Sequence, residues 1–124
     1  MTVLYCHCKD CRKATGSVYG TNLFVDKETV VSKGVLIQFI HTADSGNQMA
    51  KWFCPKYGTL MFGSSSGRPG ILTVRADTLD DTSIVKPVMN VYTDSMVPSS
   101  LLDSNLECAK KCRTTYFKRM ALND

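Results

Sequence analysis

Residues 6–11 read Cys-His-Cys-Lys-Asp-Cys and place three thiols in a segment of six residues. A hydrophobic core does not require cysteine at this density, whereas soft and borderline metal ions bind thiolates well. Zinc has no d-electron preference for one geometry, so a short loop can place three sulfurs at three corners of a tetrahedron, each about 2.3 Å from the ion. We therefore predict a zinc site formed by Cys6, Cys8 and Cys11.

The fourth corner of this tetrahedron decides which kind of site the loop makes. A fourth protein ligand gives a closed, structural site, whereas a corner open to water or substrate gives a Lewis acid that can activate a small molecule. Both alternatives need deprotonated sulfurs, and the cations of Lys9, Arg12 and Lys13 beside the loop would favour them. The competing interpretation of these cations is that they only keep the surface soluble.

Other cysteine and histidine residues have a structural interpretation as well as a metal-binding one. His7 lies between two ligands, and because neighbouring residues of a tight loop point apart, we expect it beside the site or exposed to solvent. Residues 53–58 read Phe-Cys-Pro-Lys-Tyr-Gly, the layout of a zinc knuckle whose second cysteine is replaced by tyrosine, a poor zinc ligand at neutral pH. Cys54 is therefore a lone buried cysteine or the fourth ligand of the first site. Cys108 and Cys112 are expected to pack as small hydrophobic residues.

Composition and charge are those of one globular domain. The 124 residues are 44% hydrophobic and 21% charged, and no stretch approaches the roughly 18 apolar residues of a membrane span. No secretory leader precedes the cysteines, so we expect a reducing compartment, cytoplasmic or alternatively nuclear; a disulfide framework would need an oxidising one. Residues 1–105 carry ten Lys and Arg against nine Asp and Glu, so a nucleic-acid partner is not expected.

Short apolar runs separated by Gly, Asp and Ser predict a mainly β domain over residues 1–103. The expected strands are 18–25, 29–31, 35–40, 50–53, 59–62, 71–74 and 88–92. Turn residues between these runs tolerate tight or left-handed backbone, which supports the division.

The last part of the chain, residues 104–124, has a different pattern. Ser104 and Glu107 form a capping-box signal, which is typical of a helix start. Apolar residues then recur at helical spacing at Cys108, Ala109, Cys112, Tyr116 and Met120. We therefore expect a basic C-terminal helix that docks on the β domain through this stripe.

Several motifs resemble one known family. Residues 6–17, which read Cys-His-Cys-Lys-Asp-Cys-Arg-Lys-Ala-Thr-Gly-Ser, resemble the signature of the glutathione-dependent formaldehyde-activating enzyme family, to which centromere protein V also belongs. Thr-Ala-Asp-Ser-Gly-Asn at 42–47, Phe-Cys-Pro at 53–55 and Thr-Leu-Asp-Asp at 78–81 follow in the family's order. The resemblance covers roughly residues 3–103.

The resemblance implies a β-tent fold, in which small antiparallel sheets surround a zinc site. Cys6, Cys8 and Cys11 match the family's three-cysteine zinc site, which is taken as catalytic. The family's second, structural zinc uses an early cysteine pair, which would lie upstream of Met1, and a knuckle pair of which Cys54 remains. We therefore expect one zinc and no structural second zinc. Because the family's N-terminal strand is also missing, a sheet edge is expected to be bare, which favours a homodimer.

The resemblance also implies an activity, that of a carbon-sulfur lyase. Such an enzyme combines glutathione with formaldehyde, as S-hydroxymethylglutathione, and the implied partners are this thiol and an aldehyde, with no membrane. Cys6, Cys8 and Cys11 would form the catalytic centre, and Arg12 and Lys13 would bind the carboxylates of glutathione. The alternative is a non-catalytic zinc-binding interaction module of the centromere protein V type, whose basic tail contacts a partner.

Overall fold

The computed structural model describes residues 1–111 and is mainly β, which confirms the predicted fold class. Within that range lie eight strands, one α-helix and four single-turn 3₁₀ helices. These are β1 (Thr2–Cys6), α1 (Lys9–Thr15), β2 (Gly20–Asp26), η1 (Lys27–Thr29), β3 (Ile37–Thr42), β4 (Gln48–Phe53), β5 (Leu60–Ser65), β6 (Ile71–Arg75), η2 (Ala76–Thr78), η3 (Thr82–Ile84), β7 (Met89–Val91), η4 (Thr93–Ser95) and β8 (Glu107–Cys108). None of the described helices has the length and apolar character needed to cross a membrane.

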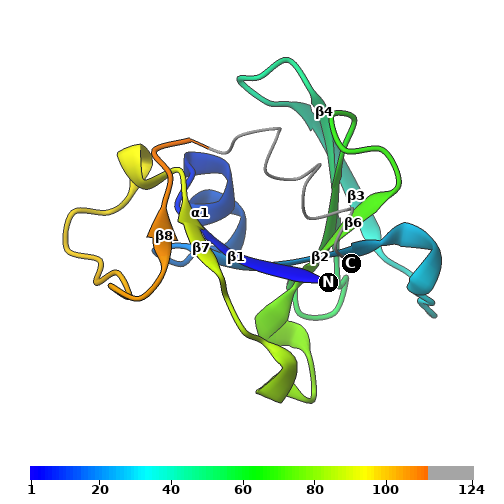
Figure 1. The fold of residues 1–124 in the computed structure, drawn as a ribbon. Coiled ribbons are helices and arrows are strands. Elements are labelled where there is room, and N and C mark those ends of the chain that lie inside the picture. The colour runs from blue at the N-terminus through cyan, green and yellow to red at the C-terminus, as the bar shows by residue number, and fades with distance from the viewer. Residues whose placement is uncertain (112–124) are drawn as a thin grey trace.

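The strands join into one hydrogen-bonded sheet with the order β3-β4-β5-β6-β2-β1-β7-β8. Most neighbours are antiparallel, while β1 with β7 and β7 with β8 are parallel. Figure 1 shows β3, β4 and β6 standing steeply to β1 and β2, so the sheet bends. The first strand lies inside the sheet, paired on both sides, and the edges among the described residues are β3 and β8. The bare edge expected at the start of the chain is therefore not at β1.

The two faces of the sheet carry different residues. Paired residues on neighbouring strands point to the same side, and side chains alternate along each strand. We call one side the core face; it holds an apolar cluster of Val3, Leu23, Leu72, Val74 and Ala76, against which Trp52 and Phe62 pack. We call the other side the site face; its cluster contains Leu4, Cys6, Cys11, Phe24, Met89 and Val91. Polar residues are also buried on the site face, as described below.

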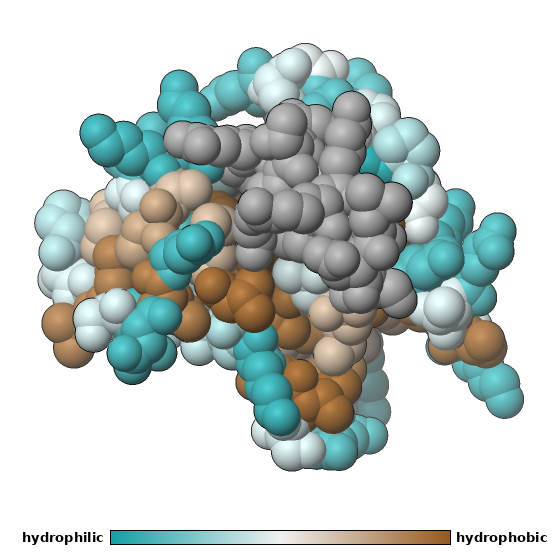
Figure 2. Space-filling model, in the orientation of Figure 1, coloured by the Kyte–Doolittle hydropathy of each residue, from teal (hydrophilic) through white to brown (hydrophobic). Residues whose placement is uncertain are grey.

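Two elements at the start of the chain were not predicted, and one predicted strand is absent. Residues 2–6 form β1 and residues 9–15 form α1 instead of one irregular loop. Residues 29–31, predicted as a strand, instead include the last residue of η1 and the start of a loop, in which Val31 is 85% exposed. Figure 2 shows apolar residues at the surface near the loop that follows η1 and over the segment between β6 and β7. Apolar composition alone was thus a misleading strand signal there.

The C-terminal helix is not confirmed where the chain can be described. Glu107 and Cys108 form β8, which pairs in parallel with Met89 and Asn90. The backbone N–H of Ala109 donates to the carbonyl of Asn90 at 2.9 Å, which extends this pairing. These sheet hydrogen bonds outweigh the local capping signal at 104–107. Cys112, Tyr116 and Met120, on which the helical stripe depended, lie outside the described residues.

Candidate metal centre

The three predicted ligands meet where the first strand passes into the helix. Cys6 is the last residue of β1, Cys8 lies in the connection and Cys11 is in the first turn of α1. Their Sγ atoms all lie within 4.8 Å of one another. Cys6 is 6% exposed and Cys11 9% exposed, while Cys8 is partly exposed. Two of the three thiols are therefore buried, and solvent reaches the cluster at Cys8.

The spacing of the sulfurs fits a tetrahedral zinc ion. Three thiolates about 2.3 Å from one such ion lie about 3.8 Å apart, so sulfurs grouped this closely need only small side-chain movements. The helix start helps to hold them, because the Sγ of Cys8 caps α1 and accepts a hydrogen bond from the N–H of Cys11 at 3.3 Å. At the other end of the helix, Gly16 has φ +69° and its N–H bonds to the carbonyl of Arg12, which ends α1 after two turns. The donor set therefore fits zinc.

The three thiols share their charge unequally in the metal-free cluster. Hydrogen bonds to Cys11 and Cys8, together with burial, raise the pKa of Cys6 well above its usual value. The hydrogen bond with Cys11, followed by burial, raises the pKa of Cys8 to about 11. Cys11 accepts hydrogen bonds from both of them, and with the nearby charge of Arg75 these hold its pKa well below the usual range. The cluster thus holds its first negative charge at Cys11, and the other two protons must leave when a metal ion binds.

Two polar side chains from the sheet hold the sulfur of Cys11. The Nδ2 of Asn22 on β2 lies 3.6 Å from this Sγ, and Nη1 of Arg75 on β6 lies 3.7 Å from it. Arg75 also donates to Oδ1 of Asn22, so the two side chains fix each other. Gly20 leaves them room, because a Cβ there would lie 3.2 Å from Nη1 of Arg75 and 3.4 Å from Cβ of Cys11. Sequence analysis missed both Asn22 and Arg75. The signal that could have identified them is a polar residue inside a predicted apolar strand, as for Asn22, or directly after one, as for Arg75.

His7 lies beside the ligands and is not exposed to solvent. Its side chain is completely buried, and Nε2 forms a 2.9 Å hydrogen bond with Oδ1 of Asn90 on β7. The backbone N–H of His7 donates to the carbonyl of Val91 at 3.0 Å, and its ring packs against Tyr19 at a centroid distance of 5.0 Å. These contacts fasten the connection between Cys6 and Cys8 to the sheet. Of the two interpretations of His7, the structure supports the position beside the site.

The remaining predicted site residues are placed apart from the thiol cluster or near its rim. Cys54 lies in the β4–β5 turn, where its carbonyl accepts from the N–H of Gly58 at 2.7 Å, and the group of close thiols within residues 1–111 does not include it. Arg12 and Lys13 lie in the last turn of α1; Lys13 is exposed, and the Nε of Arg12 is buried without a hydrogen-bond partner. All five cysteines of the described range are free thiols.

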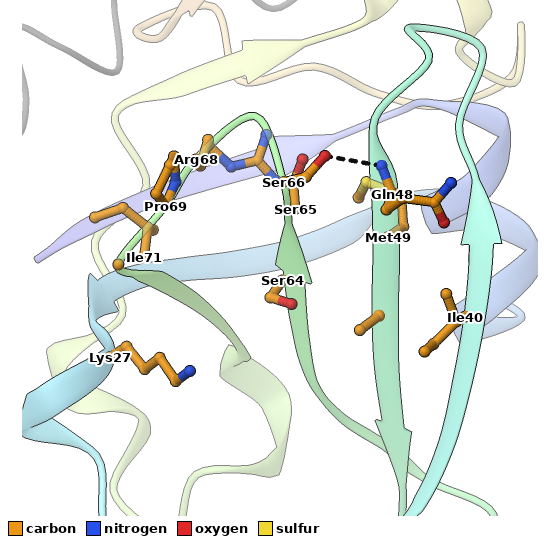
Figure 3. A pocket seen from close by; sticks show the side chains of 12 residues that line it. Lys27, Ile40, Gln48, Met49, Ser64, Ser65, Ser66, Arg68, Pro69 and Ile71 are labelled. Carbon is orange, nitrogen blue, oxygen red and sulfur yellow. Dashed lines mark hydrogen bonds between the residues drawn. The ribbon is translucent and has the colours of Figure 1, made fainter.

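A surface pocket of about 310 Å³ lies elsewhere, between β3, the start of β4, the end of β5 and the start of β6. Figure 3 shows its lining, with Lys27 and Ser64 on its lower side and a hydrogen bond from the N–H of Gln48 to Oγ of Ser66 above. Its lining contains no cysteine, histidine or carboxylate, the side chains that bind zinc. The pocket therefore does not belong to the metal centre.

Comparison with known proteins agrees with the site. A search among curated proteins finds no match to this chain. The family model described as glutathione-dependent formaldehyde-activating enzyme matches residues 1–95. That range runs from β1 to η4 and includes the three clustered thiols together with Asn22, Arg75 and Asn90. The match covers more than half of the chain, and the protein belongs to the glutathione-dependent formaldehyde-activating enzyme family.

Proposed function

We propose that this protein is a zinc-dependent carbon-sulfur lyase-like protein that acts on glutathione and formaldehyde. The observation that carries the proposal is the cluster of three thiols, whose Sγ atoms lie within 4.8 Å of one another in a domain of this family. Three cysteine ligands leave the fourth corner for a small molecule, which is the arrangement of a catalytic zinc site. Because zinc binding by these cysteines needs reduced thiols, we expect the protein to act in a reducing compartment such as the cytoplasm.

The cluster residues would hold the metal, and their neighbours would keep the sulfurs in place. When bound, zinc would supply a Lewis acid that lowers the pKa of a substrate thiol. Asn22 and Arg75 orient the sulfur of Cys11 through contacts of 3.6 and 3.7 Å. The 2.9 Å bond between His7 and Asn90 fixes the segment that carries the other two ligands. Removing one such supporting contact typically lowers metal affinity or activity by about 10- to 100-fold.

The proposed reaction is an addition without any change of oxidation state. The thiol sulfur of glutathione bonds to the carbon of formaldehyde, and the π electrons of the carbonyl move to its oxygen. That oxygen takes up the proton lost by the thiol, so the product is S-hydroxymethylglutathione and nothing else is released. The protein would accelerate this step by holding the thiol deprotonated and oriented.

Metal content is the first test. We expect purified protein to contain about one zinc per chain by elemental analysis, and Cys8→Ser to contain far less. Cys108→Ser is the matched control, because Cys108 is exposed on β8 and should not affect the metal. Cys54→Ser separates the two predicted roles of Cys54: zinc content should stay unchanged when only three cysteines bind it. A wild-type protein without stoichiometric metal would contradict the proposal.

Turnover is the second test, and it must be separated from the uncatalysed reaction of thiols with formaldehyde. Exchange spectroscopy by NMR measures how fast glutathione and S-hydroxymethylglutathione interconvert at equilibrium. We expect the exchange rate to rise in proportion to added wild-type protein and to stay at the buffer value with Cys8→Ser. A protein that binds one zinc but leaves the exchange rate unchanged would instead be a non-catalytic zinc-binding module.

A further inference from the structure

A buried cation lies on the site face without a carboxylate partner. Lys51 on β4 is 6% exposed, and its Nζ contacts Nε2 of His41 on β3. No ion pair joins Lys51 to an aspartate or glutamate in the part of the chain that the structure describes. Lysine is almost never buried to this extent unless it is paired, because removing an ammonium group from water is costly. Within residues 1–111 Lys51 is therefore held by His41 and by no carboxylate.

The neighbouring charges place Lys51 in the electrostatic environment of the metal centre. Burial lowers its pKa, and the charge of Arg75 lowers it further, whereas Asp10, Cys8 and Cys11 act in the opposite direction. Arg75 is already engaged by Cys11 and Asn22, and both cations project from the same face of the sheet. His41 contacts the ammonium group of Lys51 and adds no negative charge, because an imidazole ring is neutral or positively charged. A bound anion beside Lys51 would therefore favour its charged form.

The strand next to Lys51 places a residue without a side chain beside it. Gly63 on β5 pairs directly with Lys51 on one side and with Thr73 on the other. A Cβ built at Gly63 would have its nearest neighbours at 3.6 to 3.9 Å, the last of them Nη2 of Arg75. The site face therefore has a position without a side chain that adjoins Lys51 in the register and Nη2 of Arg75 in space. A glycine in the middle of a strand often marks such a place, where a ligand approaches the backbone.

We propose that Lys51, beside Gly63 on the site face, binds a carboxylate of the thiol substrate. The proposal rests on the proposed function, and it names the substrate class as thiols that carry a carboxylate. Glutathione has two such groups, and one of them beside Gly63 would pair with Lys51 and lie near Arg75. This assignment differs from the one based on sequence, which gave the carboxylates to Arg12 and Lys13. Lys13 is exposed, so its attraction for an anion is weakened by water and salt.

The competing explanation is that Lys51 only offsets the negative charge of the three thiolates. The two explanations predict different losses when the ammonium group is removed. An offsetting charge would weaken zinc binding and leave the preference among thiols unchanged. A carboxylate-binding group would leave zinc in place and weaken the binding of acidic ligands selectively.

S-methylglutathione is the probe, because it has both carboxylates and no thiol that could react. We expect it to bind the zinc-loaded wild-type protein in calorimetry and to bind Lys51→Met about 10- to 100-fold more weakly, the loss typical of one hydrogen bond to a charged group. Lys51→Arg should keep most of the affinity. Gly63→Val, which adds side-chain atoms beside Lys51 and suits a strand, should weaken binding to a similar degree. Lys33→Met, at an exposed loop position, is the matched control.

Each result of this titration bears on the proposal. Equal affinity of wild type and Lys51→Met for S-methylglutathione would overturn it, as would loss of zinc from Lys51→Met or a larger loss from Lys13→Met. No binding to the wild type would also overturn it. Because S-methylglutathione cannot form the adduct, binding that depends on Lys51 without any effect on glutathione exchange would contradict the proposed function alone.

Discussion

The two faces of one sheet are built from the same strands and yet differ in almost every property. On β2, Leu23 points to the core face and is 3% exposed, while the adjacent Asn22 points to the site face and is 4% exposed. On β6 the same alternation separates Val74 from Arg75. Both faces are buried, but the core face buries hydrocarbon, whereas the site face also buries polar and charged groups beside its apolar cluster.

This difference indicates that the faces have separate roles. Buried hydrocarbon stabilises a fold by roughly 25 cal/mol for each Å² removed from water. Buried polar groups stabilise little on balance and become costly when a partner is lost. The core face therefore stabilises the fold without the cost that the polar part of the site face carries. Substitutions on the two faces should then have separable effects, on unfolding and on binding.

The largest effect should come from the core face. Leu23→Ala removes a side chain that lies between Val3 and Val74 in the sheet register, and the cavity should lower the free energy of unfolding by about 2–4 kcal/mol. Urea unfolding monitored by the fluorescence of Trp52 measures this loss. Zinc content of the folded protein should not change at temperatures well below the transition. Loss of zinc from folded Leu23→Ala would show that the two faces are not separable.

The pH dependence of zinc binding tests the site face. Cys11 has a pKa well below the usual range, whereas that of Cys6 is raised and that of Cys8 is about 11. At neutral pH zinc must therefore displace about two protons, so its association constant should fall about 100-fold for each pH unit of acidification. Competition with a chromophoric chelator between pH 6.5 and 7.5 measures this slope. A slope near three protons, or near zero, would contradict the unequal sharing of charge.

Removing the contact between Arg75 and the sulfur of Cys11 should have a somewhat smaller effect on zinc affinity. Arg75→Gln keeps a polar side chain but removes the charge beside Cys11, and we expect zinc affinity to fall by about 10- to 100-fold. Arg68→Gln, on the β5–β6 turn, tests for a general effect of net charge. The same chelator competition serves for both variants. Equal affinity in Arg75→Gln and wild type would mean that the arginine contact does not support the metal centre.

Sequence analysis identified the ligands because they are close together in the chain, and it missed the residues around them because these are not. Cys6, Cys8 and Cys11 lie within one segment, whereas Asn22 and Arg75 are 11 and 64 residues from Cys11. Only the sheet register brings them to the sulfur. Most of the strands were predictable from short apolar runs between turn residues, while α1, with seven residues and a cysteine as its cap, lacked the usual helix signals.

The smallest effect should be a gain in stability on the site face. Lys51→Met replaces a buried ammonium group by an apolar side chain of similar length, and without glutathione we expect about 1 kcal/mol more stability, or roughly 4 °C in Tm. Burial lowers the pKa of Lys51, so the folded wild type binds fewer protons than the unfolded chain at alkaline pH, and its stability rises there. The advantage of Lys51→Met should therefore shrink as the pH rises. A less stable Lys51→Met would show that Lys51 supports the fold, and the site face would then contribute stability as well as binding.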